Sequence, residues 1–124
     1  MRPQSAKAKG RRFQQELVEL ILQLFPSLQS DDVQWRSMGA GGEDIILSPA
    51  ARAVLPLSAE AKNQESLSIW KALAQAAANA KGYAPVLFFK RNRSEAYAAL
   101  PAATLLSLYA ELARLKAGNP HTES

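Results

Sequence analysis

The chain contains no cysteine and a single histidine, His121. The absence of cysteine excludes disulfides, thiolate metal sites and thiol catalysis. His121 lies near the C-terminus in a segment that also carries Gly118 and Pro120, where a catalytic role is not expected. No Ser/His/Asp arrangement can be assembled around it, so hydrolysis that depends on histidine is not expected either.

Long apolar runs are missing as well. No stretch approaches the roughly 20 apolar residues that cross a bilayer, and residues 1–12 lack the apolar core of a signal peptide. With 124 residues and 48% hydrophobic content, the chain is predicted to form one globular domain with a modest core. We expect a cytoplasmic protein with no membrane partner.

Positive charge is concentrated at the N-terminal end of the chain. Five basic residues precede residue 13 with no acid among them: Arg2, Lys7, Lys9, Arg11 and Arg12. A second basic cluster comprises Lys90, Arg91 and Arg93, on a body whose charges otherwise nearly balance. This distribution favours nucleic acid as a partner. The alternative for the N-terminal cluster is a solvated tail that only keeps the protein soluble.

The spacing of apolar residues predicts an α/β fold, a single domain with a mixed β-sheet flanked by helices. The predicted order is helix 11–25, strands 33–37, 44–48 and 54–62, helix 66–80, strands 86–89 and 95–100, and helix 101–116. We expect residues 1–9 to be a disordered basic arm, residues 10–116 to be the folded domain, and residues 117–124 to be a flexible tail.

Two helices carry apolar stripes that we expect to be buried. They are Phe13, Leu17, Leu20, Ile21 and Leu24 on the first helix, and Leu105, Leu108, Tyr109, Leu112 and Leu115 on the last. Trp35 and Trp70 are also expected to be packing residues rather than platforms for stacking bases.

Two short motifs bring acidic and basic side chains to strand ends. Gly-Gly-Glu-Asp at 41–44 opens one apolar stretch, and Glu60-Ala61-Lys62 closes another. Glu60 and Lys62 share one side of a strand because residues two apart point the same way. If the strand of Asp44 pairs with theirs, two carboxylates and one ammonium converge. The alternatives are an exposed Glu60–Lys62 ion pair and Glu43 in place of Asp44.

This order of residues resembles the PD-(D/E)xK nuclease superfamily. Ser37 to Gln64 looks like the same segment of small phage-encoded nucleases, and Lys9 to Phe13 looks like the start of small Holliday-junction resolvases. The resemblance implies an αβββαβ core and a Mg²⁺-dependent DNA endonuclease, with Mn²⁺ as a substitute and no small-molecule cofactor. It also implies a homodimer, acting in the host cytoplasm if the gene belongs to a phage.

The resemblance also assigns roles to residues. Asp44, Glu60 and the Ala61 carbonyl would bind metal, and Lys62 would act on the attacking water. The acid of the first helix would be Glu16, with Glu19, Gln14 and Gln15 as open alternatives. The residues expected to contact DNA are Lys7, Lys9, Arg11, Arg12, Gln64, Lys90, Arg91 and Arg93. The rival functions are a DNA-binding module without turnover and a nuclease of ordinary duplex DNA.

Overall fold

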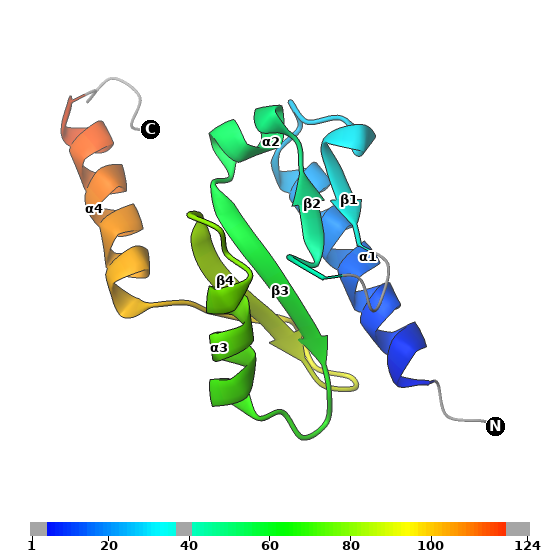
Figure 1. Cartoon of the computed structure of the whole chain (residues 1–124). Coiled ribbons are helices and arrows are strands. Elements are labelled where there is room, and N and C mark those ends of the chain that lie inside the picture. Colours follow the sequence, from blue (N-terminus) through cyan, green and yellow to red (C-terminus); the bar gives the residue numbers. More distant parts are fainter. Residues whose placement is uncertain (1–4, 37–40, 119–124) are drawn as a thin grey trace.

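A mixed three-stranded sheet stands at the centre of the molecule in a computed structural model that describes residues 5–36 and 41–118 (Figure 1). Strand β3 (Leu57–Asn63) pairs in parallel with β4 (Ala84–Lys90), and β5 (Tyr97–Ala99) pairs antiparallel with β4. Strands β1 (Val33–Trp35) and β2 (Ile45–Leu47) form a separate antiparallel pair. The α/β class and the mixed sheet predicted from the sequence are confirmed, although the strands form two small sheets.

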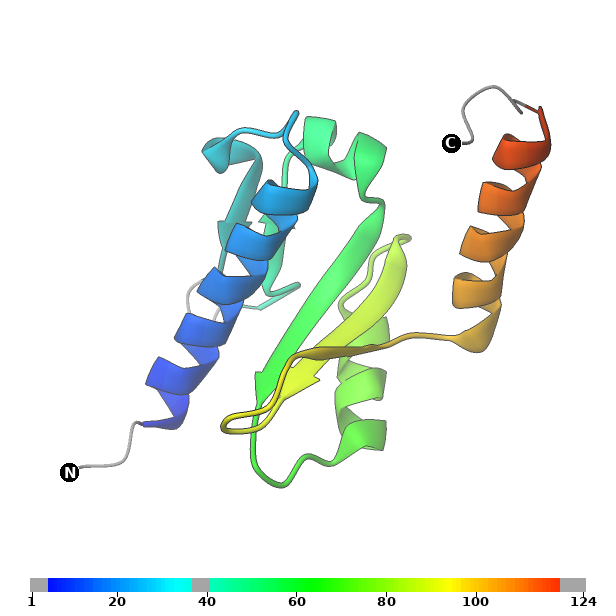
Figure 2. The ribbon, with the colours of Figure 1, turned by 180° about the vertical axis from the view of Figure 1, so that it is seen from behind.

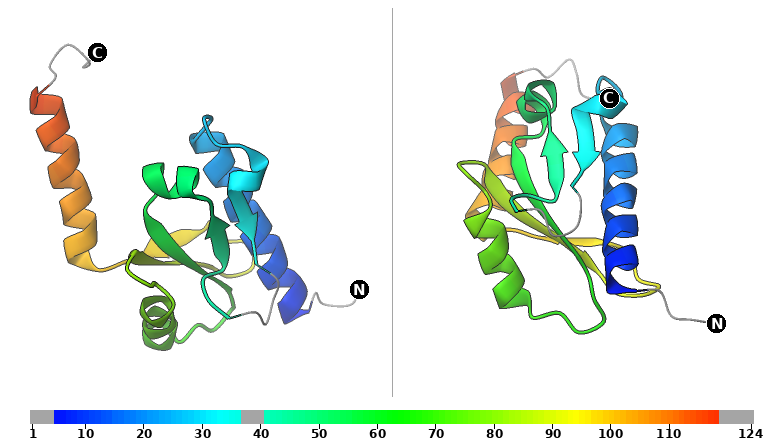
Figure 3. Two further views of the ribbon diagram at one scale, coloured as in Figure 1. Left: turned by 45° about the horizontal axis from the view of Figure 1, so that its top comes forward. Right: turned by 45° about the vertical axis from the view of Figure 1, so that its right-hand side comes forward.

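Helices cover both faces of the larger sheet. Helix α1 (Ala6–Leu24) packs on β1 and β3, whereas α3 (Ile69–Ala78) links β3 to β4 and packs on both. The right-hand view of Figure 3 shows the sheet between these two helices. None of the helices within residues 5–36 and 41–118 combines the length and apolar character needed to cross a membrane.

The core lies between α1 and the strands. Its buried apolar residues come mainly from α1, β1, β2 and β3: Phe13, Leu17, Ile21, Leu28, Val33, Ile45, Leu47, Ala51, Ala59 and Ala61. Small alanines at 59 and 61 let α1 approach β3 closely. The main-chain N–H of Asp44 donates to the Ala59 carbonyl at 2.8 Å, so the start of β2 is tied to β3.

Helix α1 begins at Ala6, five residues before the predicted start. The side chain of Ser5 caps it by accepting a hydrogen bond from the Ala8 N–H at 3.1 Å. Lys7 and Lys9 are therefore helical, and the prediction of a disordered arm was wrong for residues 6–9. Residues 1–4 lie outside the described part of the chain.

A short helix, α2 (Pro49–Val54), occupies the connection between the predicted strands 44–48 and 54–62 and the first residue of the second one. Ser48 caps it by accepting from the Ala51 N–H at 3.1 Å, and Pro49 occupies the first turn, where its missing N–H costs nothing. Strand β3 then starts after Pro56. The remaining differences lie at element ends, since β4 is longer than predicted and β5 and α3 are shorter.

The predicted apolar stripe of α1 was partly wrong. Gln14 is 2% exposed and belongs to the buried side, whereas Leu20 and Leu24 are 47% and 65% exposed. The buried side is rotated because β3 and β1 cover the face of Phe13, Gln14 and Leu17.

Helix α4 (Ala102–Gly118) also departs from expectation, since it has no buried residue and its predicted buried stripe is exposed. Figure 2 shows it standing apart from the rest of the molecule. Trp70 is 81% exposed rather than packed. The predicted tail is helical at 117–118, and residues 119–124 lie outside the described part of the chain.

Candidate functional site

Asp44 is fixed at the point where the chain enters β2. Its side-chain Oδ2 accepts a hydrogen bond from the Ala61 N–H at 2.7 Å, and its carbonyl accepts from the Arg36 N–H at 2.9 Å. Gly42, two residues earlier, has φ +96°, a conformation that side chains disfavour. The turn at Gly42 thus directs the carboxylate of Asp44 onto the centre of β3.

Glu60 lies in the middle of β3 and is 3% exposed. Its Oε1 accepts a hydrogen bond from Asn79 Nδ2 at 3.3 Å, and its Oε2 is 3.6 Å from the ammonium of Lys62. Asn79 follows α3 directly, and its carbonyl accepts a 3.4 Å hydrogen bond from Ser58 Oγ. The end of α3 is therefore tied to β3 beside the acid.

The pKa values of both carboxylates are raised, chiefly by burial. Burial raises the pKa of Asp44, against the opposing effects of the Ala61 N–H, Lys62 and Arg36. Burial also raises the pKa of Glu60, and the negative charge of Asp44 raises it further, whereas Asn79 and Lys62 lower it. Burial and the like charges make the state in which both carboxylates are ionised unfavourable. A bound cation would lower the free energy of that state.

A cavity of about 490 Å³ opens over these residues. Asp44, Glu60 and Lys62 line it, together with Gln14 of α1 and Asn79 after α3. The structure therefore brings together the three residues that the sequence predicted to converge. Lys7, Gly10, Gly42 and Gln64 also line the cavity, which therefore lies between the N-terminal part of α1 and the end of β3.

The first-helix position facing this cavity is Gln14. Glu16 is not among the lining residues: its carboxylate lies 3.9 Å from the Lys90 ammonium, and its side chain is 49% exposed. Gln14 and Glu16 are two residues apart, which corresponds to a rotation of about 200° around the helix axis. Their side chains therefore cannot face the same side. Gln15 and Glu19 are exposed. Of the four residues considered for this position, only Gln14 lines the cavity.

The donors at the site suit a hard cation. Asp44 accepts from the Ala61 N–H, and because the N–H and C=O of a strand residue point to the same edge, the Ala61 carbonyl also faces that side. Two carboxylates and a carbonyl match Mg²⁺, which keeps several waters. Within residues 5–36 and 41–118, no group of three or more His, Asp and Glu side chains is placed to hold a metal ion.

Glu43, the rival of Asp44, has a different partner. Its carboxylate pairs with the guanidinium of Arg52, and its carbonyl accepts from Arg36 Nε at 2.6 Å. Arg52 also lies 4.2 Å from the centre of the Tyr83 ring. These contacts hold the turn before β2 against α2, and Glu43 does not line the cavity of Asp44.

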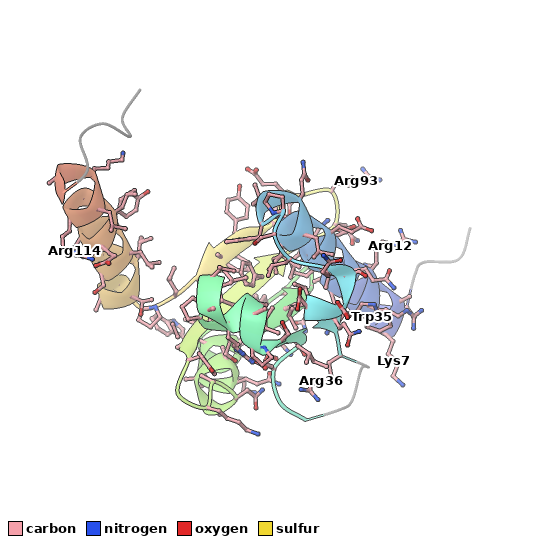
Figure 4. The ribbon with its side chains drawn as sticks, turned by 90° about the horizontal axis from the view of Figure 1, so that it is seen from above. Lys7, Arg12, Trp35, Arg36, Arg93 and Arg114 are labelled. Carbon is pink, nitrogen blue, oxygen red and sulfur yellow. The ribbon has the colours of Figure 1, made fainter. Side chains whose placement is uncertain are left out.

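Basic side chains gather at the N-terminal end of α1. We call Lys7, Lys9, Arg11 and Arg12 the basic α1 surface; Lys7, Arg11 and Arg12 are exposed, and Lys9 is half-buried. Figure 4 shows Lys7, Arg12 and Arg93 on the side of the molecule away from α4, which carries Arg114. Lys7 joins this surface to the cavity.

The residues of the second basic cluster have different surroundings. Arg91 and Arg93 are exposed in the turn after β4, which is held by a 2.7 Å hydrogen bond from the Asn92 N–H to Glu65. Lys90 is half-buried and lies beside Glu16. Gln64 lines the cavity, while its N–H extends the β3–β4 ladder by donating to the Lys90 carbonyl at 3.0 Å.

Sequence reasoning missed two polar residues that α3 brings to the cavity, Gln75 and Asn79. Gln75 lies on α3, and Asn79 caps its C-terminal end four positions later, so both side chains reach the same cavity. Two polar residues four apart in an otherwise alanine-rich segment could have indicated the side of the helix that faces the cavity. Comparison of the chain with protein-family models, with curated proteins and with solved structures found no match.

Proposed function

We propose that this protein is a divalent-metal-dependent DNA endonuclease that hydrolyses phosphodiester bonds, using Mg²⁺ or Mn²⁺. The observation that carries the proposal is the convergence of Asp44, Glu60 and Lys62 in one open cavity next to the basic α1 surface. The resemblance of the sequence to PD-(D/E)xK nucleases supports the same reaction. We further propose that the enzyme is cytoplasmic.

Four residues of the cavity have assigned parts in this reaction. Asp44, Glu60 and the Ala61 carbonyl hold the cation, which when bound stabilises charge on the phosphate and acidifies the attacking water. The ammonium of Lys62, 3.6 Å from the Glu60 carboxylate, orients that water and offsets the negative charge that develops on the phosphate. Water adds to phosphorus and one phosphorus–oxygen ester bond breaks, which leaves a phosphate monoester and a free hydroxyl.

A role in holding the cation would also account for the burial of Glu60. Glu60 is 3% exposed, and its Oε1 is oriented by the hydrogen bond from Asn79. A carboxylate that is already held in one orientation loses less conformational entropy when it binds the cation. Gln14 takes the position of the first-helix acid, so it supplies a neutral side chain at the cavity instead of a third carboxylate.

The form of DNA that we propose as the substrate follows from the kind of contacts that the basic α1 surface offers. Lysine and arginine contacts to phosphate fix position and carry no base information. Recognition by shape therefore suits the basic α1 surface better than recognition of sequence. We propose a branched substrate such as a four-way junction, as for the resolvases that the sequence resembles. Symmetric cutting of a junction requires two sites, which a homodimer supplies.

The test is incubation of the protein with labelled four-way junction, duplex and single-stranded DNA, each with Mg²⁺ or with EDTA. The proposal predicts metal-dependent cleavage, with the junction cut fastest. Preferential cutting of the plain duplex would support the nuclease activity but would show that duplex DNA, and not the junction, is the substrate. Binding without cleavage in Mg²⁺ and Mn²⁺ would identify the protein as a DNA-binding module and refute the proposed reaction.

A further inference from the structure

Helix α4 exposes a row of leucines that nothing within the described chain covers. Leu105, Leu108, Leu112 and Leu115 are 42%, 59%, 47% and 54% exposed, and no residue of α4 is buried. The left-hand view of Figure 3 shows the helix set apart from the body. A continuous apolar row of this kind on a soluble domain marks an interaction surface.

The direction of α4 is set where the helix leaves the sheet. Only Leu100 and Pro101 separate the end of β5 from Ala102. The Pro101 carbonyl accepts from the N–H groups of Thr104 and Leu105 at 3.0 and 3.2 Å, so proline belongs to the first turn of the helix. The leucine row is therefore presented on a regular helix from its first turn onward.

The spacing of the leucines indicates what covers them. Steps of three, four and three residues place Leu105 and Leu112 at the a positions and Leu108 and Leu115 at the d positions of a heptad repeat. Leu106 and Tyr109, at the b and e positions, are also exposed and widen the apolar surface beside this seam. The leucines at a and d pack against a second helix with the same repeat. A second copy of the chain provides one.

Charge complementarity selects a parallel arrangement. In a parallel pair, the residue at g faces the residue at e of the next heptad in the partner, five positions later. Glu111 occupies g and Lys116 occupies e, so each acid meets a lysine of the other copy. Within its own helix Glu111 pairs with the exposed Arg114, a contact that leaves the seam open.

We propose that α4 is a dimerisation helix that pairs in parallel with α4 of a second copy of this chain. The pairing specifies where two copies meet, and it does not depend on the chemistry of the Asp44–Glu60 cavity. Association can therefore be tested without cleavage. The pairing deepens the homodimer of the proposed function, but the metal-dependent reaction and the pairing can fail separately.

The first experiment measures the mass of the full chain by sedimentation across a range of concentrations. A dimer is expected for the unmodified protein and a monomer for Leu112→Glu. Ser107→Glu, the same acid placed on the exposed c position, is the matched control and remains dimeric. Circular dichroism of the variants keeps the signal of a folded body, because α4 has no buried residue. A monomeric unmodified protein, or a dimer that survives Leu112→Glu, overturns the proposal.

The absence of cysteine allows a direct test of the arrangement. Leu108→Cys provides the only thiol, and in a parallel pair it faces its copy across the two-fold axis at a distance a disulfide can bridge. Oxidation is expected to link two chains. Ser107→Cys, on the outer side, remains unlinked. If Leu112→Glu breaks the dimer but Leu108→Cys does not cross-link, the parallel pairing of α4 with α4 is refuted.

Charge reversal tests the parallel direction separately. Glu111→Lys and Lys116→Glu each place like charges together and raise the dissociation constant of the dimer by roughly 2- to 30-fold. Glu111→Lys combined with Lys116→Glu restores the opposite charges and returns the constant towards that of the unmodified protein. Failure of the double variant to recover argues against the parallel arrangement.

Discussion

Glu60→Gln should change how the protein responds to metal more than how it folds. The substitution keeps the volume of the side chain and an oxygen that can accept from Asn79, but it removes a charge that is 3% exposed and faces the charge of Asp44. Because burial disfavours that charge, the metal-free variant is expected to be at least as stable as the unmodified protein near neutral pH.

The size of the metal response can be worked out for the unmodified protein. Mg²⁺ at ten times its dissociation constant stabilises the folded state by about 1.4 kcal/mol. A chain of 124 residues unfolds with an entropy of about 0.26 kcal/mol per kelvin, so the melting temperature should rise by about 5 °C. Glu60→Gln should lose most of this rise, because one of two carboxylate ligands is gone.

The assay is thermal unfolding at a series of Mg²⁺ concentrations. Glu16→Gln is the matched control, since it makes the same chemical change on a side chain that is 49% exposed and outside the cavity. It should keep the full rise, and Glu19→Gln should do the same. An equal rise for Glu60→Gln and Glu16→Gln would refute the assignment of the metal to this cavity.

Further predictions concern the other groups of the site. Lys62→Ala should lose cleavage and keep the Mg²⁺-dependent rise in melting temperature, and loss of both would make Lys62 a structural residue. Gln14→Glu should bind Mg²⁺ more tightly, because it adds a third carboxylate to the cavity, and should destabilise the metal-free protein; calorimetric titration would show unchanged affinity if Gln14 does not face the cation. The raised pKa values of Asp44 and Glu60 mean that the folded state holds these protons more tightly than the unfolded chain. Their contribution to metal-free stability is thus present at acidic pH and lost as the pH rises through the raised pKa values. The Mg²⁺-dependent rise in melting temperature should grow over the same pH range. Thermal unfolding with and without Mg²⁺ at each pH would contradict this if that rise were constant. Replacing two lysines of the basic α1 surface by glutamine should lower the slope of log affinity for DNA against log salt by about 2 if both contact phosphate, whereas replacing the two basic residues of α4 should leave it unchanged, as measured by binding titrations in Ca²⁺.

Much of the candidate site could be predicted because strands have a period of two. Glu60 and Lys62 share one side of β3 by that rule alone, and the glycines before Asp44 indicate a turn that lets the chain approach β3. The partner of Asp44 could not be predicted in the same way. The Ala61 N–H that binds its carboxylate lies in β3, 17 residues further along the chain, and α2 determines how the chain returns to it.

Two errors have a common physical cause. An apolar stripe shows which residues can be buried, but the neighbouring elements decide which of them are. On α1 the buried side includes Gln14, because a polar side chain is accepted where the core opens into a cavity. On α4 the leucines remain exposed, because no element within residues 5–36 and 41–118 buries them. The basic arm was misjudged because Ser5 was not considered as a helix cap.

The most direct test of the account is the rate at which Asp44→Asn cuts a labelled four-way junction in Mg²⁺. Asparagine keeps an oxygen that can accept from the Ala61 N–H, so the fold should be retained while the charge that binds the cation is lost. Groups that only support metal ligands often cost about 10- to 100-fold when removed, so loss of a ligand should slow cleavage by about 100-fold or more. Asp31→Asn, the same change at an exposed position, should cut at the unmodified rate. Cleavage by Asp44→Asn at the rate of Asp31→Asn would contradict the account.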